Sequence, residues 1–159
     1  MALLAVDHIP DAPKAALEMR RVTKIAGVVA TTMWDRSRAN ELYGCFWDAV
    51  EAIDTTAKRP FGRQGSYGSA EALSQLWKGA GLTDIDATDL LMRCRFSSFD
   101  ELWQRCLNAD CPAGVCMERL SADRRETLRT AMRQNVLGDR PDEPFFLQAK
   151  AWAVKGIVP

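Results

Sequence analysis

Residues 27–34, Gly-Val-Val-Ala-Thr-Thr-Met-Trp, decide the fold of this chain. The stretch is rich in β-branched residues and carries no charge, which is typical of a strand buried inside a parallel sheet. Working outward, residues 2–6 form a second apolar run, and Asp11 can cap a helix between the two. The apolar stripe of that helix is formed by Ala16, Leu17, Met19 and Val22. A strand, a helix and a strand in this spacing form a βαβ unit, so we expect an α/β protein whose first two strands are parallel.

The remaining residues alternate between helical and extended patterns. Apolar spacing and caps predict helices over residues 40–53, 70–78, 99–107 and 121–137. Ser69 begins the second of these helices, and Gly138 closes the last. The apolar pattern predicts two further strands, over residues 82–95 and 145–154. Residues 55–68 contain Pro60 and several glycines, which predicts a long loop of the kind that often serves as a binding element or lid.

Composition excludes several classes of protein. The 159 residues carry 21 Lys and Arg against 21 Asp and Glu, so the excess positive charge of a sequence-independent nucleic-acid binder is missing. No apolar run approaches the roughly 20 residues that a membrane-spanning helix needs. The first residues also lack the basic start and cleavage site of a signal peptide, and we therefore expect a single cytoplasmic domain over residues 1–159.

The five cysteines are scattered, which favours reduced thiols over a disulfide framework. The spacing Cys106-x4-Cys111-x4-Cys116 invites comparison with a metal site. Zinc sites use four N or S ligands, usually with tight Cys pairs, and His8 is the one histidine in the sequence. We therefore expect no metal, and cysteines that act as small buried hydrophobic residues.

Three stretches together resemble class I S-adenosylmethionine-dependent methyltransferases. Residues 6–35, VDHIPDAPKAALEMRRVTKIAGVVATTMWD, are similar to the family's pattern PD…A..EM.RV..PGG.V....WD, which runs from its fourth strand to its fifth. Residues 68–86, GSAEALSQLWKGAGLTDID, look like the next helix and the sixth strand. Residues 145–159, FFLQAKAWAVKGIVP, look like the antiparallel seventh strand.

The resemblance implies the C-terminal half of a Rossmann-like sheet. We expect about four strands in a mixed sheet with helices on both faces. The last strand, over residues 146–154, would pair antiparallel with residues 28–34, on the side away from residues 2–6. A helical insertion, or cap, would lie between the last two strands, over about residues 97–138. The function implied is transfer of a methyl group from S-adenosylmethionine to a small-molecule acceptor.

Candidate site residues follow from the strand ends, because ligands of open α/β sheets bind outside the carboxyl ends of the parallel strands. The expected cofactor residues are Leu4, Ala5, Asp7 and His8. By the resemblance, Trp34 would lie toward the acceptor. Apart from the strand ends, the aromatic residues Tyr43, Trp47 and Trp103 would shape an apolar acceptor pocket. Methyl transfer requires alignment more than acid–base chemistry, so we assign no catalytic residue. The alternatives are that Asp7 and His8 only shape a turn and that the aromatic residues only pack helices against the sheet.

The sequence departs from the family in its cofactor half. It contains no Gly-x-Gly-x-Gly turn, and residues 24–27 read Lys-Ile-Ala-Gly where the family usually has Pro-Gly-Gly. We therefore expect a truncated protein that is inactive alone and that pairs with itself, through an exposed strand at residues 2–6, or with a chain supplying the N-terminal half. The alternatives are a non-catalytic dimerising or partner-binding module, or an unrelated small α/β protein.

Overall fold

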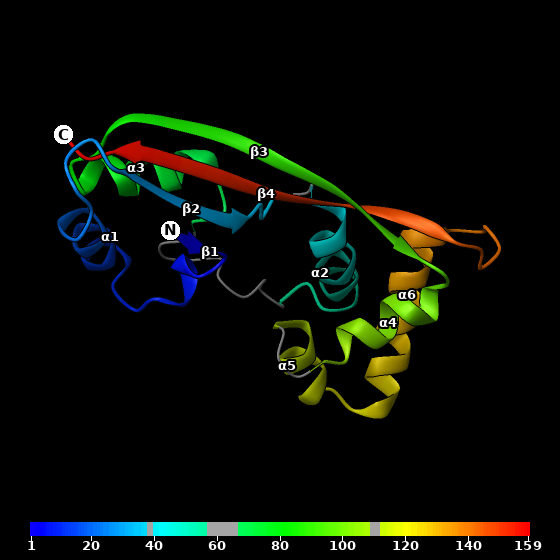
Figure 1. Ribbon diagram of the computed structural model, residues 1–159. Coiled ribbons are helices and arrows are strands. Elements are labelled where there is room, and N and C mark those ends of the chain that lie inside the picture. The colour runs from blue at the N-terminus through cyan, green and yellow to red at the C-terminus, as the bar shows by residue number, and fades with distance from the viewer. Residues whose placement is uncertain (38–39, 57–66, 109–111) are drawn as a thin grey trace. The chain divides into compact units, whose positions relative to one another are not determined.

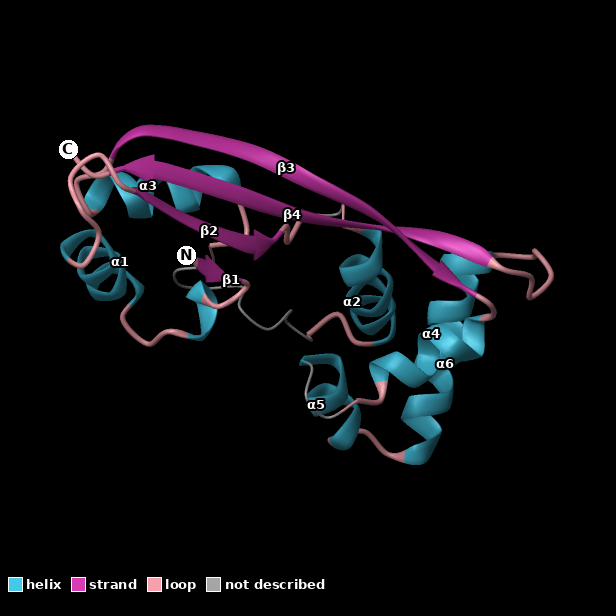
Figure 2. Cartoon of the chain, viewed as in Figure 1, coloured by secondary structure: helices cyan, strands magenta, loops and turns pink. Residues whose placement is uncertain are grey.

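The computed structural model describes residues 1–37, 40–56, 67–108 and 112–159. Four strands form one mixed sheet in the order β1-β2-β4-β3, drawn as arrows in Figure 2. The strands are β1 (Ala2–Leu3), β2 (Val28–Trp34), β3 (Thr83–Phe96) and β4 (Phe145–Ile157). The helices are η1 (Val6–His8, a 3-10 turn), α1 (Ala12–Arg21), α2 (Glu41–Ile53), α3 (Ala70–Gly79), α4 (Phe99–Cys106), α5 (Pro112–Glu118) and α6 (Ala122–Leu137). The α/β class with a mixed sheet is confirmed.

The strand pairing follows the predicted βαβ unit. β1 runs parallel to β2, with Ala2 opposite Thr31. β4 pairs antiparallel with the whole length of β2, from Val28 opposite Ile157 to Trp34 opposite Ala151. β3 lies outside β4, and Figure 1 shows the two as opposed arrows. Both predicted pairings of the strand over residues 28–34 are therefore confirmed.

The first strand is shorter than its apolar sequence predicts. β1 ends at Leu3 because Leu4 adopts a φ of +53°, a left-handed conformation that turns the chain out of the extended path. The Leu4 N–H still donates to the Thr32 carbonyl at 2.9 Å, and η1 follows, with Val6 buried. The expectation of a strand over residues 2–6 is wrong for its second half.

The first helix begins as predicted, and its predicted apolar stripe is buried only in part. Asp11 caps α1, since its Oδ1 accepts the Lys14 N–H at 3.0 Å. Ala12 and Ala16 are buried, whereas Leu17 and Val22 are 51% and 65% exposed. Neighbouring residues of a helix point about 100° apart, so a helix that turns its alanines to the core turns Leu17 outward. The predicted apolar stripe is therefore wrong for Leu17 and Val22.

The chain divides into two compact units, and β3 and β4 contribute residues to both. The first unit contains Met1–Asn40, Arg63–Met92 and Lys150–Pro159. Trp77 lies at the centre of its core, fully buried, and its Nε1 donates to the Val154 carbonyl at 3.1 Å. Ser69 caps α3 by accepting the Ala72 N–H. The predicted cap of α3 is confirmed.

The second unit contains Glu41–Gly62 and Arg93–Ala149, with α2, α4, α5 and α6. Its core includes Phe46, Phe96, Phe99, Leu102, Leu128 and Met132. Ser121 caps α6, and Gly138 ends it with a φ of +58°, which favours glycine. The three helices of the predicted insertion belong to this unit, and their role as a cap stays a prediction.

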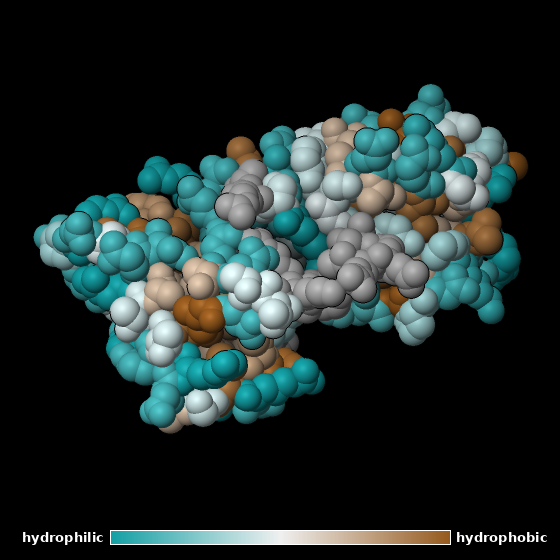
Figure 3. Space-filling model, turned by 180° about the vertical axis from the view of Figure 1, so that it is seen from behind, coloured by the Kyte–Doolittle hydropathy of each residue, from teal (hydrophilic) through white to brown (hydrophobic). Residues whose placement is uncertain are grey.

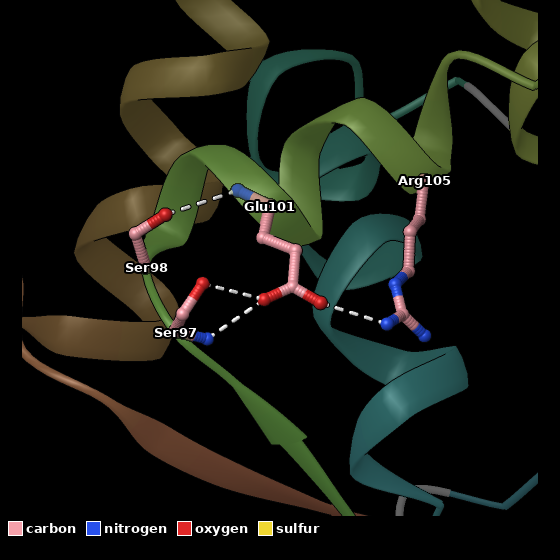
Figure 4. A network of polar contacts seen from close by, with 4 residues as sticks. All are labelled: Ser97, Ser98, Glu101 and Arg105. Carbon is pink, nitrogen blue, oxygen red and sulfur yellow. Dashed lines mark hydrogen bonds and ion pairs between the residues drawn. The ribbon is translucent and has the colours of Figure 1, made fainter.

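The start of α4 shows how polar side chains fix a helix end (Figure 4). The Ser98 Oγ accepts the Glu101 N–H at 3.2 Å, and Glu101 Oε2 accepts from both the N–H and the hydroxyl of Ser97. Arg105 adds a hydrogen bond at 2.8 Å to Oε1 of the same carboxylate. The bonds from Ser97 and from Arg105 to its carboxylate lower the pKa of Glu101 to about 2.

Several expectations concern features that the described residues only partly cover. The predicted loop over residues 55–68 lies mostly outside the described residues, because 57–66 are not described. In the described ranges, no helix has the length and apolar content to cross a membrane, and no cluster of His, Cys, Asp or Glu side chains could hold a metal ion. Cys45, Cys94, Cys106 and Cys116 are in the reduced state, outside any disulfide. Figure 3 shows hydrophobic residues as separate patches among hydrophilic ones on one face.

Candidate functional site

The candidate site is the edge of the sheet where the parallel strands β1 and β2 end, all of it within the first unit. Leu4 and Ala5 follow β1 and are half-buried, and the exposed His8 ends η1. Trp34, also half-buried, is the last residue of β2. The strand ends therefore bring together five of the predicted site residues, Asp7 among them.

Asp7 is the centre of a buried polar cluster. Its side chain is 3% exposed, and Oδ2 forms an ion pair with Arg36, whose side chain is 16% exposed. Oδ1 accepts the Tyr67 N–H at 3.0 Å, and the Arg36 N–H donates to the Gly68 carbonyl. A Cβ at Gly68 would overlap the Arg36 side chain, so only glycine allows this approach. Asp7 thus ties residues 67 and 68 to the strand ends.

The charges of this cluster affect the pKa of Tyr67. Partial burial raises the pKa of its phenol, and the negative charges of Asp7 and Asp11 raise it further. The phenol therefore stays protonated at neutral pH.

A second buried carboxylate follows β2. Asp35 is 3% exposed, its Oδ1 accepts the Ser37 N–H at 2.6 Å, and its Oδ2 lies 3.4 Å from Lys150 Nζ. Burial alone raises the pKa of Asp35, but the hydrogen bonds from Ser37 and the Lys150 ammonium outweigh it and lower the pKa below its ordinary value. Lys150 also lies 3.7 Å from Asp89 and 4.3 Å from the centre of the Trp152 ring. Asp35 is therefore an ionised carboxylate inside the fold.

Asn40 links the end of β2 to β4 through hydrogen bonds to backbone carbonyls. It is 1% exposed, and its Nδ2 donates to the carbonyls of Asp35 and Lys150 at 2.9 and 3.1 Å. The Asp35 N–H donates to that Lys150 carbonyl as well. The end of β2 is thus held against β4 by a satisfied polar network.

Comparisons with known proteins give little beyond the architecture. No protein-family profile and no curated protein matches the sequence. One solved structure that resembles the chain is that of a Bacillus halodurans C-125 protein described as "a putative methyltransferase". The two share 15% identity at a TM-score of 0.49, and the match covers 99% of this chain and 62% of the other. The chain thus spans less than two thirds of that protein, and a similarity of this size carries no argument about function.

The other predicted acceptor residues lie in the second unit. Tyr43 and Trp47 are on α2, with ring centroids 6.4 Å apart, and Trp103 is on α4. Trp47 and Trp103 are 4% and 6% exposed and belong to the core of their unit. Their burial fits the packing role that the sequence left open, and their contact with an acceptor stays a prediction.

An open cavity of about 570 Å³ in the second unit lies elsewhere on α2 and α6. Its lining residues are Ile53, Asp123, Glu126, Thr127, Thr130 and Ala131. None of the predicted acceptor residues is among those that line it.

Sequence reasoning missed Asp35, Arg36, Asn40 and Lys150 as members of the candidate site. Asp35 and Arg36 carried a usable signal, because they directly follow the strand whose carboxyl end was singled out. Lys150 carried none, since it reaches the site only through the pairing of β4 with β2.

Proposed function

We propose that this chain forms the methyl-acceptor side of an S-adenosylmethionine-dependent methyltransferase that acts on a small molecule. The observation that carries the proposal is the strand order β1-β2-β4-β3, with β4 antiparallel between β2 and β3. This order agrees with the one that the sequence resemblance implies for the second half of the family's sheet. The sequence motifs and the strand pairing thus support the same assignment.

The site of this activity is the carboxyl edge of β1 and β2, where open α/β sheets bind their ligands. Leu4 and Ala5 would contact the methionine end of S-adenosylmethionine, with His8 beside them, and Trp34 would face the acceptor. Asp7 and Asp35 are engaged by Arg36 and Lys150. In this proposal both carboxylates stabilise the conformation of the strand ends.

The fit to S-adenosylmethionine is partial. The sequence has no Gly-rich turn, so the chain offers contacts to the methionine end and the acceptor but not the usual ones to adenosine. S-adenosylmethionine, when bound, supplies a methyl group that its sulfonium already activates. The work of these residues is then to align the acceptor and exclude water. A second copy or another chain would supply the adenosine contacts.

Photo-cross-linking tests the proposal without requiring turnover. The chain is irradiated with methyl-labelled S-adenosylmethionine at millimolar concentration, and the labelled peptides are mapped. We expect label in the peptides that contain Leu4 to His8 or Trp34, and loss of that label in Ala5→Leu. Ala52→Leu, at an exposed position of α2, is the matched control and should leave the label unchanged. Label confined to the second unit, or label unaffected by Ala5→Leu, contradicts the proposal.

A non-catalytic dimerising module is the second candidate function. The observation that favours it is the run of exposed apolar residues 90–92 on β3.

A further inference from the structure

The outer edge of β3 is the longest open edge of the sheet among the described strands. β3 and β1 stand at the two ends of the strand order. β1 contains 2 residues, whereas β3 contains 14. An open edge presents unpaired N–H and C=O groups, which pair readily with another strand.

The middle of this strand is apolar and exposed. Leu90, Leu91 and Met92 are 47%, 59% and 54% exposed. Because consecutive residues of a strand point to opposite faces, the run exposes apolar side chains on both sides of the sheet. Asp89 precedes the run and Arg93 follows it, which gives the sequence Asp-Leu-Leu-Met-Arg.

This short sequence is complementary to itself when two copies run antiparallel. Across a two-fold axis perpendicular to the sheet, directly opposite residues point to the same face, so their numbers are both odd or both even. With Leu91 on the axis, Asp89 stands opposite Arg93 of the second copy, and Leu90 stands opposite Met92. Each charge meets its opposite and each apolar residue meets an apolar residue.

Neighbouring registers lose this match. An axis at Leu90 places Arg93 opposite Ala87. An axis at Met92 pairs Asp89 with Arg95 but places Arg93 opposite Leu91. An axis at Asp89 places the two Asp89 carboxylates opposite each other.

We propose that the outer edge of β3 is a homodimer interface, in which two copies pair antiparallel through residues 89–93 about a two-fold axis at Leu91. Within the chain both charged side chains contact β4, since Asp89 lies 3.7 Å from Lys150 and the Arg93 guanidinium lies 4.4 Å from the Phe146 ring. Pairing of one short strand buries less than the roughly 1,200 Å² of a stable interface, so the dimer is weak and depends on concentration.

Sedimentation velocity over a wide range of protein concentration tests the interface. We expect a reversible dimer in the wild type. Asp89→Arg and Arg93→Asp each place like charges opposite one another and should weaken dimerisation by at least about tenfold. An equal mixture of the two variants, and the double variant that carries both changes, should restore it, because opposite charges face each other again. This rescue separates a lost interface from a lost fold.

Two matched variants separate this edge from other surfaces. Leu3→Lys alters the opposite edge of the sheet, and Glu71→Arg changes an exposed charge on α3. Both should dimerise like the wild type. A wild type that stays monomeric throughout, a dimer that Leu3→Lys breaks instead, or charge-reversed variants that the mixture fails to rescue would each overturn the proposal.

Discussion

Replacing Asp35 by Asn should destabilise the first unit, because the Lys150 ammonium loses its charged acceptor. The amide has the shape of the carboxylate and can still accept the Ser37 N–H. What disappears is the negative charge beside Lys150, whose side chain is only 16% exposed.

The expected cost follows from distance and burial. At an effective dielectric constant of about 20, unit charges 3.4 Å apart attract by about 5 kcal/mol. Two effects reduce this loss. The neutral amide no longer carries the cost of burying a charge, and Lys150 keeps its ion pair with Asp89 at 3.7 Å. We therefore expect the free energy of unfolding to fall by about 2–3 kcal/mol, measured by urea denaturation at pH 7.

Asp86→Asn is the matched control. Asp86 lies at the same 3.4 Å from Lys155, but both side chains are more than half exposed, at 60% and 58%. Solvent screens such a pair, so its loss should cost about 0–1 kcal/mol. Equal costs for Asp35→Asn and Asp86→Asn would refute the argument that burial makes the Asp35 pair strong.

The pH dependence gives a second check on Asp35. Its pKa in the folded protein lies below the ordinary 3.8, so its contribution to stability is present above that value and lost as the pH falls through the folded pKa. The difference in stability between wild type and Asp35→Asn should therefore be full at pH 7 and shrink below about pH 4. A difference that stays constant down to acid pH would contradict this.

Three further predictions concern other parts of the chain. Calorimetric titration of the chain alone should show S-adenosylmethionine binding no tighter than about 10 μM, because the Gly-rich turn is missing from its sequence, and tighter binding would contradict this. An NMR titration should place the pKa of Glu101 at about 2, and Ser97→Ala should raise it because one hydrogen bond is lost; an unchanged value would exclude this cause. Burial raises the pKa of Cys45 to about 12, so alkylation at pH 8 should modify Cys45 more slowly than Cys94 or Cys106, and equal rates would count against it.

The elements whose signals are local could be predicted from the sequence. β2 follows from a run of β-branched residues, and α3, α4 and α6 begin at Ser69, Ser98 and Ser121, whose hydroxyls accept N–H groups of the first turn. The composition of the run at residues 2–6 favoured a strand, but the left-handed backbone of Leu4 overrides it. Such a conformation at a leucine has no signature in the residue types.

The candidate site was predictable only as a location. The carboxyl ends of β1 and β2 follow from the βαβ pattern, which places Leu4, Ala5, His8 and Trp34 at one edge. The pairing of Asp35 with Lys150 depends on which strand lies beside β2, and 115 positions separate the two residues (150 − 35). No local pattern contains that information. The ion pair of Asp7 with Arg36 likewise requires the two strand ends to be adjacent.

The most direct test of the proposed site is an NMR titration of the isotope-labelled chain with S-adenosylhomocysteine at millimolar concentrations. This ligand carries the same adenosine and homocysteine groups without the reactive methyl. We expect chemical-shift changes concentrated at Leu4, Ala5, His8 and Trp34, with the amides of the second unit unaffected. Shifts confined to the second unit, or no shifts at all, would contradict the assignment of the strand ends as a methyltransferase site.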